Sequence, residues 1–77
     1  MIEYSKQAEK FILSQGRSQA LRIFKAIDKL PLGDIKRLKG RNSPQLYRLR
    51  IGDYRAVFCI DEDKIKILKV DNRGDIY

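Results

Sequence analysis

One short turn, Gly52-Asp53, lies between two segments in which apolar and polar residues alternate, and it restricts the possible folds most. Glycine and aspartate at this point are typical of a two-residue β-hairpin loop. The loop fixes the register of the two strands, which we expect at residues 46–51 and 54–60. The predicted cross-strand pairs are Ile51 with Tyr54, Arg50 with Arg55, and Leu49 with Ala56.

Alternation places the side chains of these two strands on two opposite faces. One face is apolar, and we expect it to form the core: Tyr47, Leu49, Ile51, Tyr54, Ala56, Phe58 and Ile60. The other face carries three arginines beside smaller apolar residues: Arg48, Arg50, Arg55, Leu46, Val57 and Cys59. A slip of one residue would bury the arginines, so the hydrophobic pattern supports this register.

The N-terminal part of the chain has helical periodicity instead. After a short strand at residues 2–4, Ser5 is the predicted N-cap of a first helix, and Gly16 can end it. Ser18 is the predicted cap of a second helix, which Pro31 stops. The apolar residues of the first helix are Ala8, Phe11 and Ile12, and those of the second are Ala20, Ile23, Phe24, Ile27 and Leu30.

The remaining segments complete a meander of strands. Residues 35–39 form a weak strand candidate, residues 40–44 a loop, and residues 64–70 a further strand after an acidic turn. The expected fold class is therefore α+β. A short N-terminal strand and an αα-hairpin pack on one face of an antiparallel β-meander, in a single domain over residues 1–77.

The net charge of +7 is concentrated in the middle of the chain. Residues 36–55 contain seven positive residues and only one negative residue, Asp53, which leaves a net +6. The positive residues are Lys36, Arg37, Lys39, Arg41, Arg48, Arg50 and Arg55. Such a distribution favours a polyanionic partner, chiefly nucleic acid. The alternative is a basic surface that serves solubility alone.

Several classes of protein are disfavoured by composition. The chain has one cysteine, Cys59, and no histidine, so an internal disulfide is impossible and a zinc site of the usual kind is nearly excluded. Cys59 lies in an apolar run and is more plausibly a packed residue than a nucleophile. No segment resembles a membrane span or a signal peptide, so we expect a cytoplasmic protein without membrane association.

The predicted hairpin places Arg50 directly opposite Arg55. Like charges in this position destabilise a strand pair by roughly 0.2–1 kcal/mol. An anion between them would offset this repulsion, and arginine can grip phosphate in a bidentate manner. A solvated basic face, in which arginine stems cover apolar neighbours, is the alternative. RNA cleavage by attack of the 2′-hydroxyl would need such cations and one acid or base, without a metal or other cofactor.

Three segments resemble the RelE/ParE toxin superfamily. Residues 46–61, LYRLRIGDYRAVFCID, resemble its central hairpin. Residues 64–77, KIKILKVDNRGDIY, resemble its closing strand and its R-G-D-[VI]-Y tail, and residues 36–40, KRLKG, resemble the segment before the hairpin. The resemblance covers nearly the whole chain and implies the RelE-like fold.

For RelE-type members, the resemblance implies an mRNA endoribonuclease that acts in the ribosomal A site without metal. Carried over, Arg55 and Arg73 would stabilise the scissile phosphate, and Tyr77 would be the general base or acid. Arg48 and Arg50 would hold the RNA and lower the pKa of the acid or base. The predicted catalytic residues are Arg48, Arg50, Arg55, Arg73 and Tyr77. The predicted RNA-binding residues are Lys36, Arg37, Lys39, Arg41, Arg48 and Arg50.

The resemblance also implies partners. A cognate antitoxin protein would bind the chain, and operator DNA would be contacted only indirectly, through that antitoxin. Three alternatives stay open. The chain could be a ParE-like inhibitor of DNA gyrase, a non-catalytic basic module that binds RNA or the ribosome, or an inactive antitoxin-binding remnant.

Overall fold

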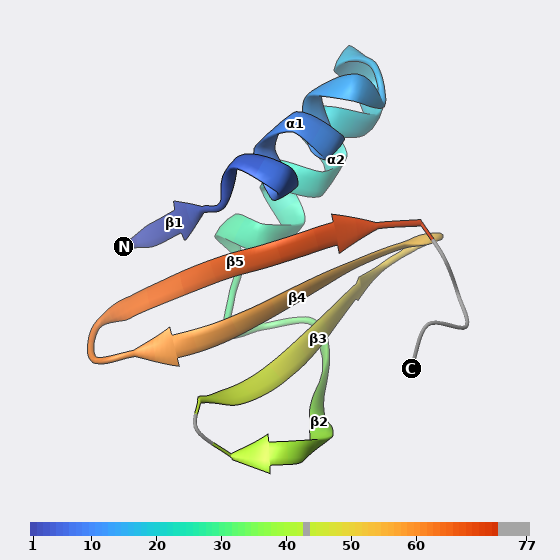
Figure 1. Ribbon diagram of the computed structural model, residues 1–77. Helices are drawn as coiled ribbons and strands as arrows, with labels where there is room; N and C mark the ends of the chain where they lie inside the picture. Colours follow the sequence, from blue (N-terminus) through green and yellow to red (C-terminus); the bar gives the residue numbers. More distant parts are fainter. Residues whose placement is uncertain (43, 73–77) are drawn as a thin grey trace.

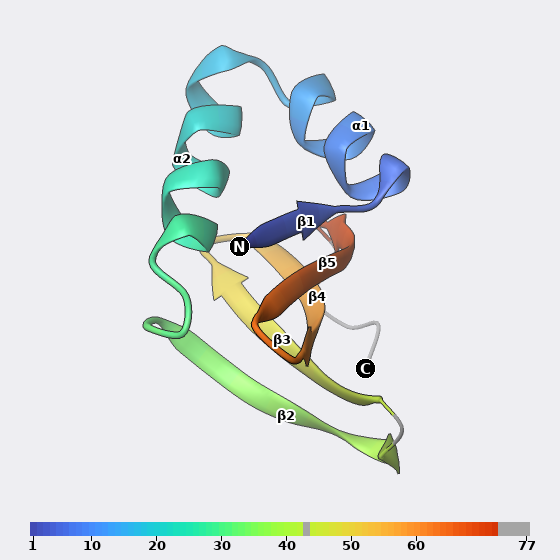
Figure 2. The same ribbon diagram turned by 90° about the vertical axis from the view of Figure 1, so that its left-hand side faces the viewer.

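A single sheet with two helices on one face makes up the part of the chain that the structure describes (Figures 1 and 2). A computed structural model describes residues 1–42 and 44–72, apart from the side chains of residues 40–42. In chain order the elements are β1 (Ile2–Tyr4), α1 (Lys6–Ser14), α2 (Arg17–Asp28), β2 (Asp34–Asn42), β3 (Gln45–Ile51), β4 (Tyr54–Asp61) and β5 (Lys64–Asp71). The predicted α+β fold class is therefore confirmed.

The strand order is β1-β5-β4-β3-β2. Strands β2 to β5 form the predicted antiparallel meander, and β1 adds to β5 in parallel. The hairpin register is also as predicted, with Arg50 opposite Arg55 and Leu49 opposite Ala56. Gly52 has a φ of +59°, which L-residues with a side chain rarely adopt, and this explains why the turn contains glycine.

The core lies between the helices and one sheet face. Ala8 and Ile12 of α1, and Ile23 and Ile27 of α2, are fully buried. On the sheet they meet Leu49, Ile51, Ala56, Phe58, Ile67 and Val70. Full burial of one isoleucine, leucine, valine or phenylalanine side chain stabilises the fold by roughly 1.5–3 kcal/mol. The apolar face predicted from the hairpin is thus the core face along most of its length.

Ile60 is the exception, because it is 49% exposed and does not belong to the core as predicted. It lies near the end of β4, opposite Ile65 of β5. The β4–β5 turn extends away from the helices (Figure 1), so the helix layer does not reach this end of the strand pair.

The helix boundaries follow the predicted caps in part. The Ser5 hydroxyl caps α1 by accepting a hydrogen bond from the Ala8 N–H at 3.0 Å, as expected. The prediction that Ser18 caps α2 was wrong, because the N-cap is Gly16, with a φ of +92°. Gly16 directly follows the C-cap of α1, and α2 begins at the next residue, Arg17. Ser18 therefore lies inside the first turn of α2 and cannot be its N-cap. Helix α2 ends at Asp28, before the predicted stop at Pro31.

The second strand is longer than predicted. β2 continues to Asn42, so the prediction of a loop over residues 40–44 was wrong for residues 40–42. Its pairing with β3 is irregular between Arg37 and Asn42. Such an irregularity interrupts the alternation of side chains, which is why this segment resembles a loop in sequence. No helix in the described part of the chain is long and apolar enough to cross a membrane.

Replacing Ser5 with alanine should destabilise the protein by about 1 kcal/mol, because the first turn of α1 loses its cap. The variant also loses the hydrogen bond that the Ser5 hydroxyl donates to the Leu68 carbonyl at 2.7 Å. Urea unfolding measures this change. Ser14→Ala is the matched control, since its exposed hydroxyl bonds only within α1 and to Gln15. Equal stability of the two variants would contradict the assignment.

Stability should fall as the pH rises from 10 to 12, in part because of Tyr4. Burial, followed by the negative charge of Asp28, raises the pKa of Tyr4 from 10.0 to about 12. The folded state therefore favours the neutral phenol. This contribution is complete below pH 10 and is lost as the pH rises through the folded pKa. Unfolding of Tyr4→Phe across this range should show a shallower fall than the wild type, and an identical fall would contradict the prediction.

Candidate nucleic-acid interface

Basic side chains from three strands meet in one concavity of about 720 Å³. Strands β2, β3 and β4 each contribute to its lining. Two of the lining residues are apolar, Leu38 of β2 and Leu46 of β3. Its cationic residues are Lys36, Arg37, Lys39, Arg48, Arg50 and Arg55, and no carboxylate lines it. The structure thus brings together six of the residues that the sequence assigns to RNA binding or catalysis.

The register places Arg50 and Arg55 in the middle of a row that crosses four strands. Asp34 of β2 is the partner of Arg50, and Asp71 of β5 is the partner of Arg55. Each arginine therefore has an aspartate on its outer side. Opposite charges on neighbouring strands offset the repulsion between the two arginines. The sequence alone does not predict that these aspartates flank the arginines, because the pairing of β2 and β5 with their neighbours is set by tertiary structure and not by a local turn.

The next row along the sheet lacks this balance. It consists of Lys36, Arg48, Val57 and Lys69, with three cations and no carboxylate. Arg48 reaches back toward Asp34, with Nη2 at 3.9 Å from Oδ1, a separation at the long end for an ion pair. This row therefore has an excess of positive charge, although Lys69 also lies 4.0 Å from Asp71.

Arg48 also has an unsatisfied group. Its side chain is only 14% exposed, and Nη1 is buried without a hydrogen-bond partner among the described residues. A buried donor attached to a charged group is costly to leave unpaired. A phosphate oxygen in the concavity would satisfy it, because guanidinium groups bind phosphate through two parallel N–H donors.

The face opposite the helices is less open than predicted. The sequence predicts Arg55 on an open face, but Arg55 is only 7% exposed, and Val57 and Cys59 of the same face are 8% and 5% exposed. By register, Val57 lies between Arg48 and Lys69, and Cys59 lies opposite Lys66. The aliphatic stems of these long side chains flank the two small residues. Cys59 is thus a packed residue, as the sequence indicated.

The structure describes some of the other predicted site residues but not all of them. Arg37 donates a hydrogen bond from Nη2 to Gln45 Oε1 at 3.0 Å, and Lys36 and Lys39 are exposed. The side chain of Arg41, and Arg73 and Tyr77, lie outside the described residues. Within the described part of the chain, no group of histidine, cysteine or acidic residues could hold a metal ion.

Comparison with known proteins finds one family and several solved structures. Residues 2–77 match the family described as the ParE toxin of type II toxin–antitoxin systems. The archaeal RelE–RelB complex from Pyrococcus horikoshii OT3 contains a chain that is 30% identical, with a TM-score of 0.78. The match covers 96% of this chain and 94% of that one. No curated protein sequence gives a significant match.

Two further complexes have the same fold. The RelB–RelE complex from Methanococcus jannaschii matches at 27% identity and a TM-score of 0.64, covering 97% of this chain and 94% of that one. The RelBE2 toxin–antitoxin complex from Mycobacterium tuberculosis matches at 22% identity and a TM-score of 0.75, covering 95% and 96%. At 22% identity, the likeness concerns the fold alone.

Arg48→Gln should weaken the binding of a single-stranded RNA oligonucleotide and change its salt dependence. Each phosphate contact contributes about 0.7 to the slope of log K against log salt concentration for a single strand. Loss of one contact should therefore reduce the slope by about that amount. Fluorescence anisotropy at several salt concentrations measures it. Lys10→Gln, an exposed position on α1, is the control with the same change in charge, and it should leave the slope unchanged.

Proposed function

Since the chain belongs to the ParE toxin family of type II toxin–antitoxin systems, we propose that it is a RelE-type toxin that cleaves mRNA in the ribosomal A site. The observation that carries this proposal is the cationic concavity around Arg48, with a buried guanidinium nitrogen that lacks a partner among the described residues. The likeness to RelE chains at 30% and 27% identity supports it.

The proposed reaction is attack by the RNA 2′-hydroxyl on the adjacent phosphate. The protein then needs to hold the backbone in line and to stabilise charge on the phosphate oxygens. Arg48 and Arg50 would bind the RNA backbone. Arg55, together with Arg73, would stabilise the scissile phosphate. Arginines hold their positive charge at any physiological pH, so this stabilisation would require no metal ion.

Proton transfer would fall to a residue other than arginine, which is a poor acid or base. Tyr77 is the proposed general base or acid, on the basis of its match to the family's C-terminal tail. A cation close to a phenol lowers its pKa, because the positive charge favours phenolate. The arginines would therefore serve both the phosphate and the proton transfer.

A cognate antitoxin is the proposed protein partner, in the cytoplasm. The P. horikoshii and M. jannaschii relatives are each in complex with RelB, at 30% and 27% identity to this chain. Operator DNA would be reached only through the antitoxin. The charge of +7 suits an acidic partner as well as RNA, so antitoxin and RNA would compete for the same cations.

Inhibition of DNA gyrase is the second candidate, because the matching family is described by the ParE toxin. A gyrase inhibitor acts through protein contacts and has no need of a cluster of phosphate-binding arginines. The arginine-lined concavity therefore favours RNA cleavage over this alternative. A non-catalytic RNA-binding module would share the concavity and differ only in the absence of cleavage.

The purified chain should cut mRNA on programmed ribosomes at the A-site codon, and EDTA should not affect the cuts. Arg55→Gln should slow cleavage by about a hundredfold or more, as expected for loss of a group that stabilises the transition state. Arg50→Gln should reduce cleavage through loss of a contact with the RNA backbone, and because Arg50 is exposed, this variant carries little risk to folding. Lys10→Gln should cut at the wild-type rate.

The same samples distinguish the alternatives. A folded chain that binds ribosomes without cutting mRNA would refute the endoribonuclease proposal. Inhibition of gyrase supercoiling by that chain would then identify the second candidate. Circular dichroism of each variant establishes that a loss of cleavage is not a loss of fold.

A further inference from the structure

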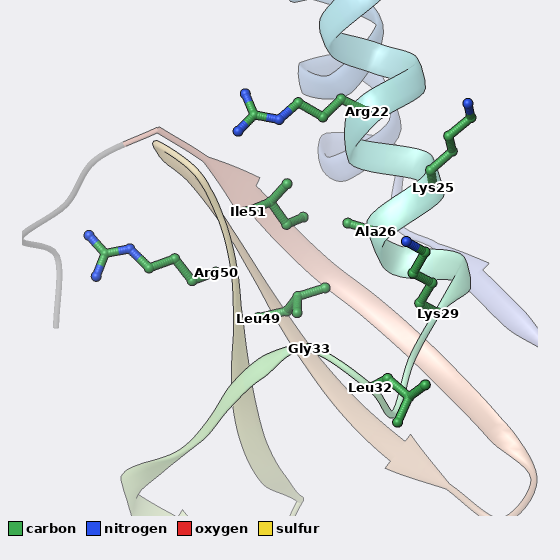
Figure 3. Close-up of a pocket in the computed structure, with 9 residues that line it drawn as sticks. All are labelled: Arg22, Lys25, Ala26, Lys29, Leu32, Gly33, Leu49, Arg50 and Ile51. Carbon is green, nitrogen blue, oxygen red and sulfur yellow. The ribbon is translucent and has the colours of Figure 1, made fainter.

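A second groove, on the helix side of the sheet, combines an apolar floor with a cationic rim (Figure 3). It has a volume of about 360 Å³ and lies between α2, the end of β3 and the segment that joins α2 to β2. The floor consists of Ala26, Leu32, Leu49 and Ile51. In Figure 3, Leu49 and Ile51 point from β3 toward α2.

The rim is formed by Arg22, Lys25, Lys29 and Arg50. Arg22 and Lys25 of α2 and the C-cap residue Lys29 lie at intervals of three and four residues, and therefore on one side of the helix. All four side chains are exposed, and no carboxylate lines the groove. None of the four is in an ion pair with a carboxylate of the described residues. The rim thus carries the charges of Arg22, Lys25 and Lys29, which no acidic group of the groove offsets, and the charge of Arg50, which Asp34 flanks from β2.

Two glycines allow close approaches beside the groove. A Cβ at Gly33 would lie 2.8 Å from Leu49 Cδ1, so only glycine lets this segment pass so close to β3. A Cβ at Gly52 would lie 3.0 Å from Arg22 Cζ, which places the Arg22 guanidinium over the β3–β4 turn. Leu32, beside Gly33, is 71% exposed and adds accessible apolar surface to the lining of the groove.

We propose that this groove binds an acidic peptide segment that carries apolar side chains, and that its occupant also engages Arg50. The proposal rests on the proposed function, because it identifies where the antitoxin would bind. Apolar side chains of the segment would cover the exposed Leu32, and its carboxylates would pair with the cations of the rim.

The lining favours a peptide over RNA. Four of the nine residues that line the groove are aliphatic and four are cationic, a mixture that suits an amphipathic acidic peptide better than a phosphate backbone. The floor is aliphatic, which suits leucine or isoleucine side chains. The concavity around Arg48, in contrast, is lined by six cations and only two leucines.

Arg50 connects the groove with the candidate interface, because it lines both cavities. It projects from the side of β3 opposite to Leu49 and Ile51 (Figure 3), so it lies at the end of the groove. The described β2–β3 pairs end at Arg50, so Ile51 has no partner in β2 among them. A segment that leaves the groove over this edge reaches Arg50 and removes one cation from RNA binding.

Binding of synthetic peptides to the full chain tests the proposal. The first probe is an amphipathic peptide of glutamate and leucine, and the second has serine in place of each leucine. Fluorescence anisotropy should show that the leucine peptide binds at least about tenfold more tightly. Leu32→Ser should remove most of this difference, whereas Leu13→Ser, at a leucine of α1 that is 61% exposed, should preserve it. Equal affinity for the two peptides, or no effect of Leu32→Ser, would overturn the proposal.

Charge reversal tests the rim. Replacing Arg22, Lys25 and Lys29 with glutamate should weaken the leucine peptide by about tenfold or more. The control reverses Lys6, Lys10 and Arg17, three exposed cations outside the groove, and should bind as the wild type does. Equal weakening in both triple variants would show non-specific attraction and would contradict the groove as the site.

The role of Arg50 has a separate readout. Saturation with the leucine peptide should lower the affinity of the wild type for single-stranded RNA, and Arg50→Gln should abolish most of this competition. Unchanged RNA affinity would refute the connection through Arg50. None of these measurements needs cleavage. Peptide binding by a chain that never cuts mRNA would therefore refute only the endoribonuclease, whereas cleavage without peptide binding would refute only the groove.

Discussion

The turn at Gly52 holds β3 and β4 in a single register, in which every second side chain of both strands faces the helices. A slip of one residue would exchange Leu49 and Ala56 for arginines in the core. The helices α1 and α2 can cover the sheet only in the observed register. The same register brings Arg48, Arg50 and Arg55 together on the other face, so the core and the candidate site have one common cause.

This arrangement has a cost that the outer strands partly offset. Arg50 and Arg55 oppose each other, and a chain of this length has little stability to spare. Asp34 and Asp71 flank the pair at the outer strands and reduce the repulsion. One row further on, Arg48 has no such compensation in its own row and keeps a buried donor without a described partner. The charges of the sheet are thus balanced in the row of Arg50 and Arg55. An excess of positive charge stays in the row of Arg48, where a phosphate would bind.

Local signals in the sequence predict the hairpin, the α1 cap and the core face, because each depends on neighbouring residues only. These local signals fail where the surroundings of a side chain depend on a segment distant in the sequence. Asp34 and Asp71 reach the arginines through strand pairing, and Val57 and Cys59 are buried between long side chains of adjacent strands. The groove beneath α2 is invisible in the sequence for the same reason. From the sequence alone, three cations at helical spacing indicate only a solvated helix face: Arg22, Lys25 and Lys29. The fold brings Leu32 into the same groove.

A small core also bears on how such a chain would be controlled. Leu32 and other large apolar side chains stay exposed on the helix side, while the cations on both sides of β3 repel one another. A partner that covers Leu32 and neutralises the rim would stabilise the folded state by mass action. Under the proposed function, that partner would remove Arg50 from the RNA surface in the same step. The same contacts would then stabilise the folded state and inhibit RNA binding. A partner that inhibits more tightly would therefore also stabilise the fold more strongly.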